Sequence, residues 1–245
     1  MYVIKNGVSY TLPELSAFNG FQTKFRASAE SKMFSHGGIS VSDNKIDYRE
    51  LELGVYIDGQ NKNDYRAQVD ELKQSLSRQN QQLYIEDDRY INIAGISQIQ
   101  EEFSPGFYMV KGEVTFTLLA LDPFIYCAID KFATIQIIAT DYQFTVVNPG
   151  NIDTPLTLTI TADELCDQVV LINNTDNRVM NYMDAQFQAS RVLKVSTANG
   201  TVTLDGNNSI NNFSGTFLRL IPGSNVFTYQ GGACTIRIDY LARWF

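Results

Sequence analysis

Runs in which apolar and polar residues alternate, separated by turn-forming residues, fill the second half of this sequence. The clearest run covers residues 235–245. One set of alternate positions carries Ile236, Ile238, Tyr240, Ala242 and Trp244, and the other carries Arg237, Asp239, Leu241, Arg243 and Phe245. Successive side chains of a strand point to opposite faces, so this period of two predicts a single strand that reaches the last residue and lies in a sheet.

Similar runs recur about every ten residues upstream. They cover residues 144–147, 155–161, 169–172, 192–195, 201–204 and 217–221. Turn sequences lie between them, such as Asn148-Pro149-Gly150, the hairpin signal Asn199-Gly200, and Pro222-Gly223. Short strands at this spacing predict an all-β domain over residues 126–245, built as a two-layer sandwich or jelly roll.

The first half mixes strands with one helix. Strands are predicted for residues 48–57, 82–86, 90–94 and 112–121, and Leu51, Leu53, Val55 and Ile57 share one strand face. From Asp64 to about Gln81 the period changes to that of a helix, with Asn63 or Asp64 as its N-cap. Pro123 ends the last strand, so we expect an N-terminal β-sandwich domain with this helix over residues 1–125.

Composition limits the function classes. The 245 residues are 44% hydrophobic and 19% charged, which suits β-rich cores and protein contacts. A formal net charge of −8 argues against direct binding to a nucleic-acid backbone, which needs clustered positive charge. We find neither a signal-peptide pattern nor an apolar run of about 18 residues, so we expect no secretion and no membrane span.

Cysteine and histidine are too sparse for common metal or nucleophilic sites. Cys127, Cys166 and Cys234 are odd in number and far apart, so we predict buried free thiols in a protein that folds in a reducing cytoplasm. His36, the one histidine, stands in the glycine-containing loop Ser35-His36-Gly37-Gly38. A plain loop residue is favoured there over a catalytic base, and no cofactor or metal site is predicted.

Two weaker chemical hypotheses remain open. Glu50 and Glu52 share a strand face, and pleat geometry places them about 7 Å apart, within reach of an inverting glycosidase. Such pairs are common on solvated strands, so we expect that the protein is not an enzyme. Aromatic side chains could stack on sugars if they faced outward, and the candidates are Tyr182, Tyr229, Tyr240 and Trp244. Tyr240 and Trp244 alternate with Ile236 and Ile238, which favours core packing for them.

Ordered blocks of the sequence resemble the distal tail proteins (Dit) of siphophages and related prophages. Examples are Leu121-Asp122-Pro123-Phe124, Val147-Asn148-Pro149-Gly150-Asn151 and Ile221-Pro222-Gly223-Ser224-Asn225. The full set covers residues 48–76, 83–90, 112–126, 147–155, 217–225 and 236–244. Each motif is generic by itself, and their order and spacing carry the resemblance.

The resemblance implies a non-enzymatic hub in the virion, assembled in the host bacterial cytoplasm. Such proteins form a homohexameric ring through the first domain, which joins the major tail tube protein to a tail-associated tip protein of the baseplate. The second domain would be a galectin-like sandwich that projects outward. Some relatives carry inserted sugar-binding modules, and this chain has no insertion of that length. The alternative function is a carbohydrate-binding module or adhesin that contacts a host-surface glycan or a receptor-binding protein.

Two sets of residues are predicted to make contacts in such an assembly. The ring interface is expected around Phe34, His36, Ile39 and Val41 and on the helix at Tyr65 and Val69. The alternative for that helix is an amphipathic lid on its own sheet. A contact with a neighbour or with the first domain is expected at Leu241, Arg243 and Phe245.

Overall fold

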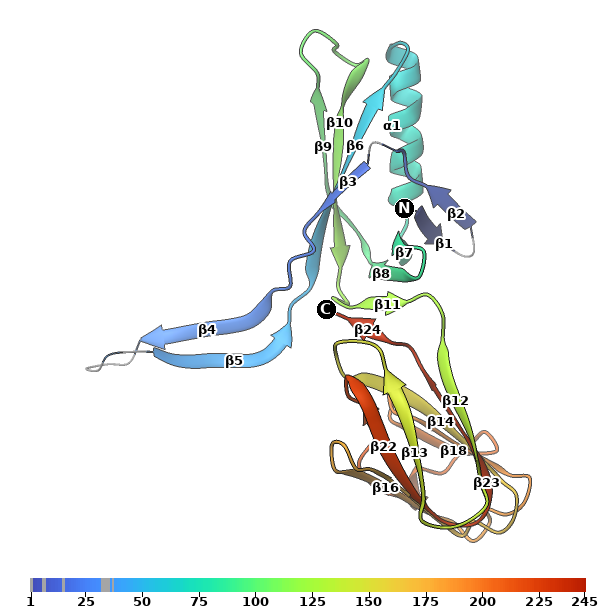
Figure 1. Ribbon diagram of the computed structural model, residues 1–245. Helices are drawn as coiled ribbons and strands as arrows, with labels where there is room; N and C mark the ends of the chain where they lie inside the picture. The colour runs from blue at the N-terminus through green and yellow to red at the C-terminus, as the bar shows by residue number, and fades with distance from the viewer. Residues whose placement is uncertain (1, 6–7, 15, 32–35, 37) are drawn as a thin grey trace. The chain divides into compact units, whose positions relative to one another are not determined.

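A computed structural model describes the chain except for residues 1, 6–7, 15, 32–35 and 37, and the side chains of residues 2–5, 8, 27–29, 38–42 and 44. The chain divides into two compact units (Figure 1). The first unit is Met1–Ile125 with Phe245, and the second is Tyr126–Trp244. Both consist mostly of antiparallel strands, which confirms the predicted mainly-β fold class.

The first unit contains two main sheets and one α-helix. One sheet has the order β3 (Ser16–Asn19), β6 (Arg49–Asp58), β10 (Lys111–Ala120) and β9 (Gly95–Phe103). The other contains β2 (Val8–Thr11), β1 (Tyr2–Lys5), β7 (Gln81–Glu86) and β8 (Arg89–Ile93), in that order. A separate hairpin pairs β4 (Phe25–Ser31) with β5 (Gly38–Ile46).

The alternation in β6 and β10 creates the core of the first unit. Leu51, Leu53, Val55 and Ile57 are at most 2% exposed, as are their β10 neighbours Val114, Phe116, Leu118 and Ala120. Helix α1 (Lys62–Leu76) covers this face with its four buried side chains, Tyr65, Val69, Leu72 and Leu76. Burial of one such large side chain contributes about 1.5–3 kcal/mol. The helix is therefore the predicted lid on its own sheet.

The helix boundaries differ from the prediction. Asn61 is the N-cap, and its Oδ1 accepts hydrogen bonds from the backbone N–H groups of Asn63 (3.0 Å) and Asp64 (3.1 Å). The predicted caps Asn63 and Asp64 instead lie in the first turn. The helix ends at Leu76, and Gln81 already begins β7. Polar residues between two elements carry no periodicity, so the pattern did not locate these ends.

The second unit is a two-sheet sandwich. One sheet has the order β12 (Lys131–Ile137), β23 (Cys234–Tyr240), β14 (Thr154–Ala162), β17 (Val192–Ser196), β18 (Thr201–Leu204) and β19 (Asn207–Asn208). The short β21 (Arg219–Leu220) pairs with β14. The facing sheet has the order β13 (Tyr142–Asn148), β22 (Gly223–Gln230), β15 (Gln168–Asn173), β16 (Arg178–Met183) and β20 (Phe213–Gly215). A 3₁₀ turn, η1 (Ile210–Asn212), precedes β20.

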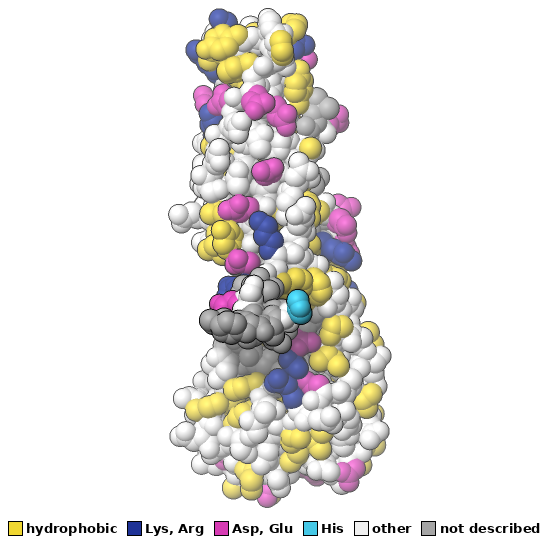
Figure 2. All heavy atoms as spheres, turned by 90° about the vertical axis from the view of Figure 1, so that its left-hand side faces the viewer, with side chains coloured by type: hydrophobic (Ala, Val, Ile, Leu, Met, Phe, Trp, Pro, Cys, Tyr) yellow, Lys and Arg dark blue, Asp and Glu magenta, His cyan; other side chains and the backbone are white. Residues whose placement is uncertain are grey.

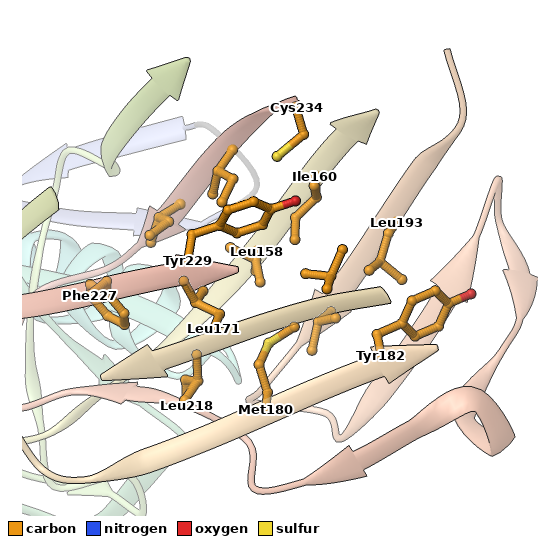
Figure 3. Packing of buried hydrophobic residues seen from close by; sticks show 14 of the residues in the cluster. Leu158, Ile160, Leu171, Met180, Tyr182, Leu193, Leu218, Phe227, Tyr229 and Cys234 are labelled. Atoms are coloured by element: carbon orange, nitrogen blue, oxygen red, sulfur yellow. The ribbon is translucent and has the colours of Figure 1, made fainter. Parts of the chain in front are cut away.

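Side chains from the two sheets interdigitate between them (Figure 3). Leu158, Ile160 and Leu193 come from one sheet, and Leu171, Met180 and Phe227 come from the other. Inward alternation in both sheets is what a sandwich core requires. The hairpin predicted at Asn199-Gly200 joins β17 to β18, and Gly200 has the left-handed φ of +63° that favours glycine.

The prediction of one strand over residues 235–245 is wrong. Strand β23 ends at Tyr240, and the short β24 (Arg243–Trp244) pairs instead with β11 (Ile125–Cys127). Alternation continues through buried Ala242 while the pairing partner changes. Side-chain periodicity reports which face a residue occupies and says nothing about its partner strand. The strand predicted over residues 217–221 is likewise shortened to β21.

Candidate interaction surfaces

The β4–β5 hairpin extends away from the rest of the first unit and forms a two-stranded arm (Figure 1). Among the described residues, its two strands pair only with each other. The guanidinium of Arg26 lies 3.9 Å from Asp43 and 3.7 Å from Asp47 within the arm, and Phe25 at the arm's root is 50% exposed. An isolated two-stranded hairpin is only marginally stable in water. The arm is therefore a candidate surface for contact with another protein chain, which would stabilise it.

Three of the six predicted ring residues lie in or beside this arm. His36 lies exposed in the bend between β4 and β5 and is the one cyan side chain in Figure 2. Ile39 and Val41 lie in β5. Phe34 lies outside the described residues, and the side chains of Ile39 and Val41 are also outside that description. Their part in a ring contact stays a prediction.

Tyr65 and Val69 do not form a surface. They are 1% and 3% exposed because they point into the core beneath α1. This corrects the prediction that these two side chains face a ring neighbour. Burial raises the pKa of the Tyr65 hydroxyl, and the nearby Glu101 carboxylate raises it further. The hydroxyl has no hydrogen-bond partner among the described residues.

The residues predicted to make a contact at the end of the chain behave differently from one another. Arg243 donates from Nε (2.8 Å) and Nη2 (2.5 Å) to the backbone oxygen of Asp153, inside its own domain. Phe245 is 42% exposed, and its ring meets that of Phe25 edge-on, with centroids 6.0 Å apart. Leu241 is half-buried. An outer contact at these positions remains a prediction.

A polar cavity lies at the root of the arm, where the chain enters β4 and returns from β5. It has a volume of about 460 Å³. The lining residues are Asn19, Gly20, Gln22, Lys24, Tyr48, Arg49, Glu50 and Glu52. Arg49 is the unusual member, because it is only 3% exposed while the charged side chains around it are exposed.

Arg49 could have been noticed in the sequence, since it occupies the apolar phase of its strand, two residues before Leu51. Its Nη1 donates to the backbone oxygen of Phe21 (3.0 Å) and its Nη2 to Thr23 Oγ1 (3.2 Å). Its Nε has no partner among the described residues. Burial lowers the pKa of this guanidinium, although Arg remains charged at neutral pH.

Glu50 and Glu52 lie on the exposed face of β6, at the rim of this cavity. A glycosidase needs one carboxyl group held protonated, commonly by apolar surroundings. The cavity lining is polar or charged apart from glycine and the ring of Tyr48. This environment gives the glycosidase hypothesis no support.

The loop between β9 and β10 is an exposed surface that the sequence patterns did not single out. Phe107 and Tyr108 are 49% and 63% exposed. Lys111 Nζ lies 5.4 Å from the ring centroid of Phe107, and Lys62 Nζ lies 5.7 Å from that of Tyr108. Cations over aromatic faces are favourable at about 0.5–1 kcal/mol in exposed positions. The arrangement makes this loop a second candidate contact.

The proposed sugar platforms of the second domain are mostly internal. Tyr182 and Tyr229 are fully buried and lie among the core residues in Figure 3, so they cannot stack on a ligand. The Tyr240 hydroxyl donates to the backbone oxygen of Val147 at 2.6 Å. Trp244 is half-buried. The most exposed aromatic of this domain is Phe132, on which the guanidinium of Arg237 lies at 4.6 Å from the centroid.

All three cysteines are buried free thiols, as predicted. Burial raises the pKa of Cys234 to about 12 and also raises that of Cys166. Within the described part of the chain, no group of three His, Cys, Asp or Glu side chains is arranged to hold a metal ion. No described helix is long and apolar enough to cross a bilayer.

Comparison with known proteins first defines the class of the second domain. Residues 149–244 match the family model described as siphovirus-type tail component, C-terminal domain. The second domain is thus similar to the C-terminal domain of siphovirus-type tail components. A search of curated proteins found no match.

A solved structure then extends the likeness to the whole chain. The crystal structure of Dit from phage SPP1, described as a paradigm of hub adsorption apparatus in phages that infect Gram-positive bacteria, has a TM-score of 0.76 and 14% identity. The alignment covers 100% of this chain and 99% of that chain, so the two share a fold. With the family match, this confirms the predicted resemblance to distal tail proteins.

Two structures of the phage P2 baseplate in its activated conformation also align with the chain. The structure with Ca covers 97% of both chains, and the structure with Sr covers 97% of this chain and 96% of the other. Each has 10% identity and a TM-score of 0.40.

Proposed function

We propose that this protein is the hub of a siphovirus-type tail tip. Six copies form a ring through the first domain, and the ring joins the major tail tube protein to a tail-associated tip protein. The second domain is a galectin-like sandwich that projects outward from the ring. The protein acts in the virion, assembles in the host bacterial cytoplasm, and has no enzymatic role.

The observation that carries the ring is the arm formed by β4 and β5. Its strands find no third strand among the described residues, and two strands alone bury too little surface to be stable. A ring closed by head-to-tail contacts needs two different surfaces on each copy, one of which reaches the neighbour. The arm can supply the reaching surface, and the body of the first unit can supply the receiving one.

The second candidate function, a carbohydrate-binding module or adhesin, has less support. Two of its four aromatic candidates are buried, and a third uses its hydroxyl within the domain. Exposed Phe132 could still contact a partner, although the guanidinium of Arg237 already covers one side of its ring. A glycan array that stays silent at high protein concentration would eliminate this alternative.

Native mass spectrometry and negative-stain electron microscopy test the ring. We expect purified protein, alone or mixed with its tube and tip partners, to form closed particles that contain six 27.6 kDa chains. A variant in which a short Gly-Ser linker replaces residues 25–46 should keep the cooperative unfolding of the remaining fold and remain monomeric.

A matched control shortens the β9–β10 loop instead, by replacing residues 105–109 with two glycines. This variant should still form rings, because the proposal assigns the ring contact to the arm and leaves exposed Phe107 and Tyr108 of this loop for a different partner. Rings that form equally well without the arm would contradict the proposed role of the hairpin. A protein that remains monomeric with every tail partner would contradict the hub itself.

A further inference from the structure

Arg49 is a buried cation without a carboxylate in its own chain. It is 3% exposed, and two of its nitrogens are satisfied only by neutral oxygens, those of Phe21 and Thr23. No described Asp or Glu forms an ion pair with it, and the residues outside the description (1, 6–7, 15, 32–35 and 37) include no Asp or Glu. Any carboxylate partner must therefore come from outside this chain.

An uncompensated buried charge is costly. Removal of an ion from water into a protein interior costs several kcal/mol, and close pairing with an opposite charge offsets that cost. The Nε–H group adds a second cost, since a buried donor without a hydrogen-bond partner destabilises the folded chain. A planar guanidinium is also the side chain best suited to bind a carboxylate through directed hydrogen bonds.

The cavity at the root of the arm gives a carboxylate access to this side chain. Arg49 lines it together with Lys24, so two cations meet there. Glu50 and Glu52 also line the cavity, but they lie exposed, where water and salt screen their charge. Water and salt screen the charge of the buried Arg49 guanidinium much less, so this charge dominates the electrostatic potential close to it.

We propose that this cavity binds the carboxylate of Glu30 from a second copy of the chain, with Arg49 and Lys24 as its ligands. Glu30 lies exposed on β4, and no ion pair holds it within its own chain among the described residues. The other acids of the arm, Asp43 and Asp47, already lie near Arg26. Among the described residues of the arm, Glu30 is therefore the carboxylate that no ion pair holds.

Strand geometry separates Glu30 from the cavity of its own copy. Glu30 is five residues beyond Phe25 in β4, which at about 3.3 Å per residue places it roughly 16 Å along the arm. A glutamate side chain cannot span that distance. The inference rests on the proposed ring, in which the arm of one copy reaches the next, and it identifies the receiving surface as the arm root of the neighbour.

Zero-length cross-linking of assembled rings tests this contact without mutation. A carbodiimide couples a carboxylate to an amine that touches it, so we expect an amide bond between Glu30 and Lys24. Rings made from equal parts of ¹⁴N and ¹⁵N chains should give this cross-link with mixed isotopes, which shows that it joins two copies. The Glu30→Gln variant should lose the cross-link while keeping links between other pairs.

A double-mutant cycle measures the energetic coupling. Glu30→Gln should weaken subunit association about tenfold, as expected for one charge-assisted contact of about 1.4 kcal/mol. In an Arg49→Gln background the same change should have little further effect, because the two residues act as a pair. Gln98→Ala, on the exposed face of β9, is the control and should leave association unchanged.

The outcomes separate this contact from the ring itself. Wild-type rings that show neither the Glu30–Lys24 cross-link nor any loss of affinity in Glu30→Gln would overturn the contact and leave the hub intact. Wild-type protein that forms no oligomer with its tail partners would overturn both. If Arg49→Gln fails to fold, the cross-link and the Glu30→Gln affinity still decide the matter.

Discussion

Asn225 offers a sharp test of how the second domain holds its turns. The side chain is fully buried, in the segment Ile221-Pro222-Gly223-Ser224-Asn225 that leads into β22. Its Oδ1 accepts from the backbone N–H of Ile221 (2.9 Å) and from Nδ2 of Asn173 (3.2 Å). Its Nδ2 donates to the backbone oxygens of Ile221 (2.8 Å) and Gly223 (3.1 Å).

Replacement of Asn225 by alanine removes all four hydrogen bonds at once. Two donors lose an acceptor, the N–H of Ile221 and the amide of Asn173, and the latter keeps its bond to Arg219 O (3.0 Å). Each unsatisfied buried group costs about 1–3 kcal/mol, and water can partly replace the lost bond at half-buried Ile221. We therefore expect the free energy of unfolding of the second domain to fall by about 3 kcal/mol.

Urea unfolding followed by the fluorescence of Trp244, the single tryptophan, measures this loss in the second domain. With a slope of about 1–3 kcal/mol per molar urea, the midpoint should fall by about 1–3 M. Exposed Asn207→Ala is the matched control and should shift the midpoint little. An Asn225→Ala variant within about 0.5 kcal/mol of wild type would refute this account of the turn.

Three further predictions concern the helix cap, the arm root and the thiols. Asn61→Ala should destabilise the first domain by about 1 kcal/mol in urea unfolding, and Asn63→Ala, which removes no cap, by clearly less. Gly20→Ala should be severely destabilising, because its Cβ would lie 2.3 Å from a backbone oxygen of β6. The control Gly106→Ala is also at positive φ but in open space, and it should cost about 1 kcal/mol of stability. Equal shifts of the thermal midpoint in the two variants would contradict the steric argument. Burial raises the pKa of Cys234 to about 12, so a thiol reagent at pH 8 should label the native protein very slowly. The same reagent should label the unfolded protein at all three cysteines. Rapid labelling of the native protein would show that the thiols are accessible.

Much of the secondary structure followed from local patterns. The alternation in residues 48–57 and 112–121 predicted β6 and β10 and their buried faces, because period two maps directly onto the two sides of a strand. Helical spacing likewise predicted the buried side chains of α1. Its ends were missed, since the capping Asn61 is one of several polar residues that could serve equally well.

The candidate contact sites were less accessible to sequence reasoning. A ring contact was expected around residues 34–41, but neither the strand patterns nor the motifs of the resemblance predicted the arm itself. Tyr65 and Val69 were misassigned because an apolar helix face can serve either a core or an interface. Arg49 stood in the apolar phase of its strand, a visible signal. Its significance depended on knowing that no carboxylate approaches it, which is a property of residues distant in sequence.

The sequence by itself determined the two faces of each strand and helix, the β-rich class and the resemblance to distal tail proteins, because these depend on neighbours within a few positions or on ordered motifs. Only the tertiary structure decided which strand pairs with which, so that the final alternating run divides between β23 and β24. It also decided that β4 and β5 stand as an arm and that Arg49 is buried without a carboxylate. Pairing and burial depend on groups far apart in the chain, and local periodicity carries no information about those distances.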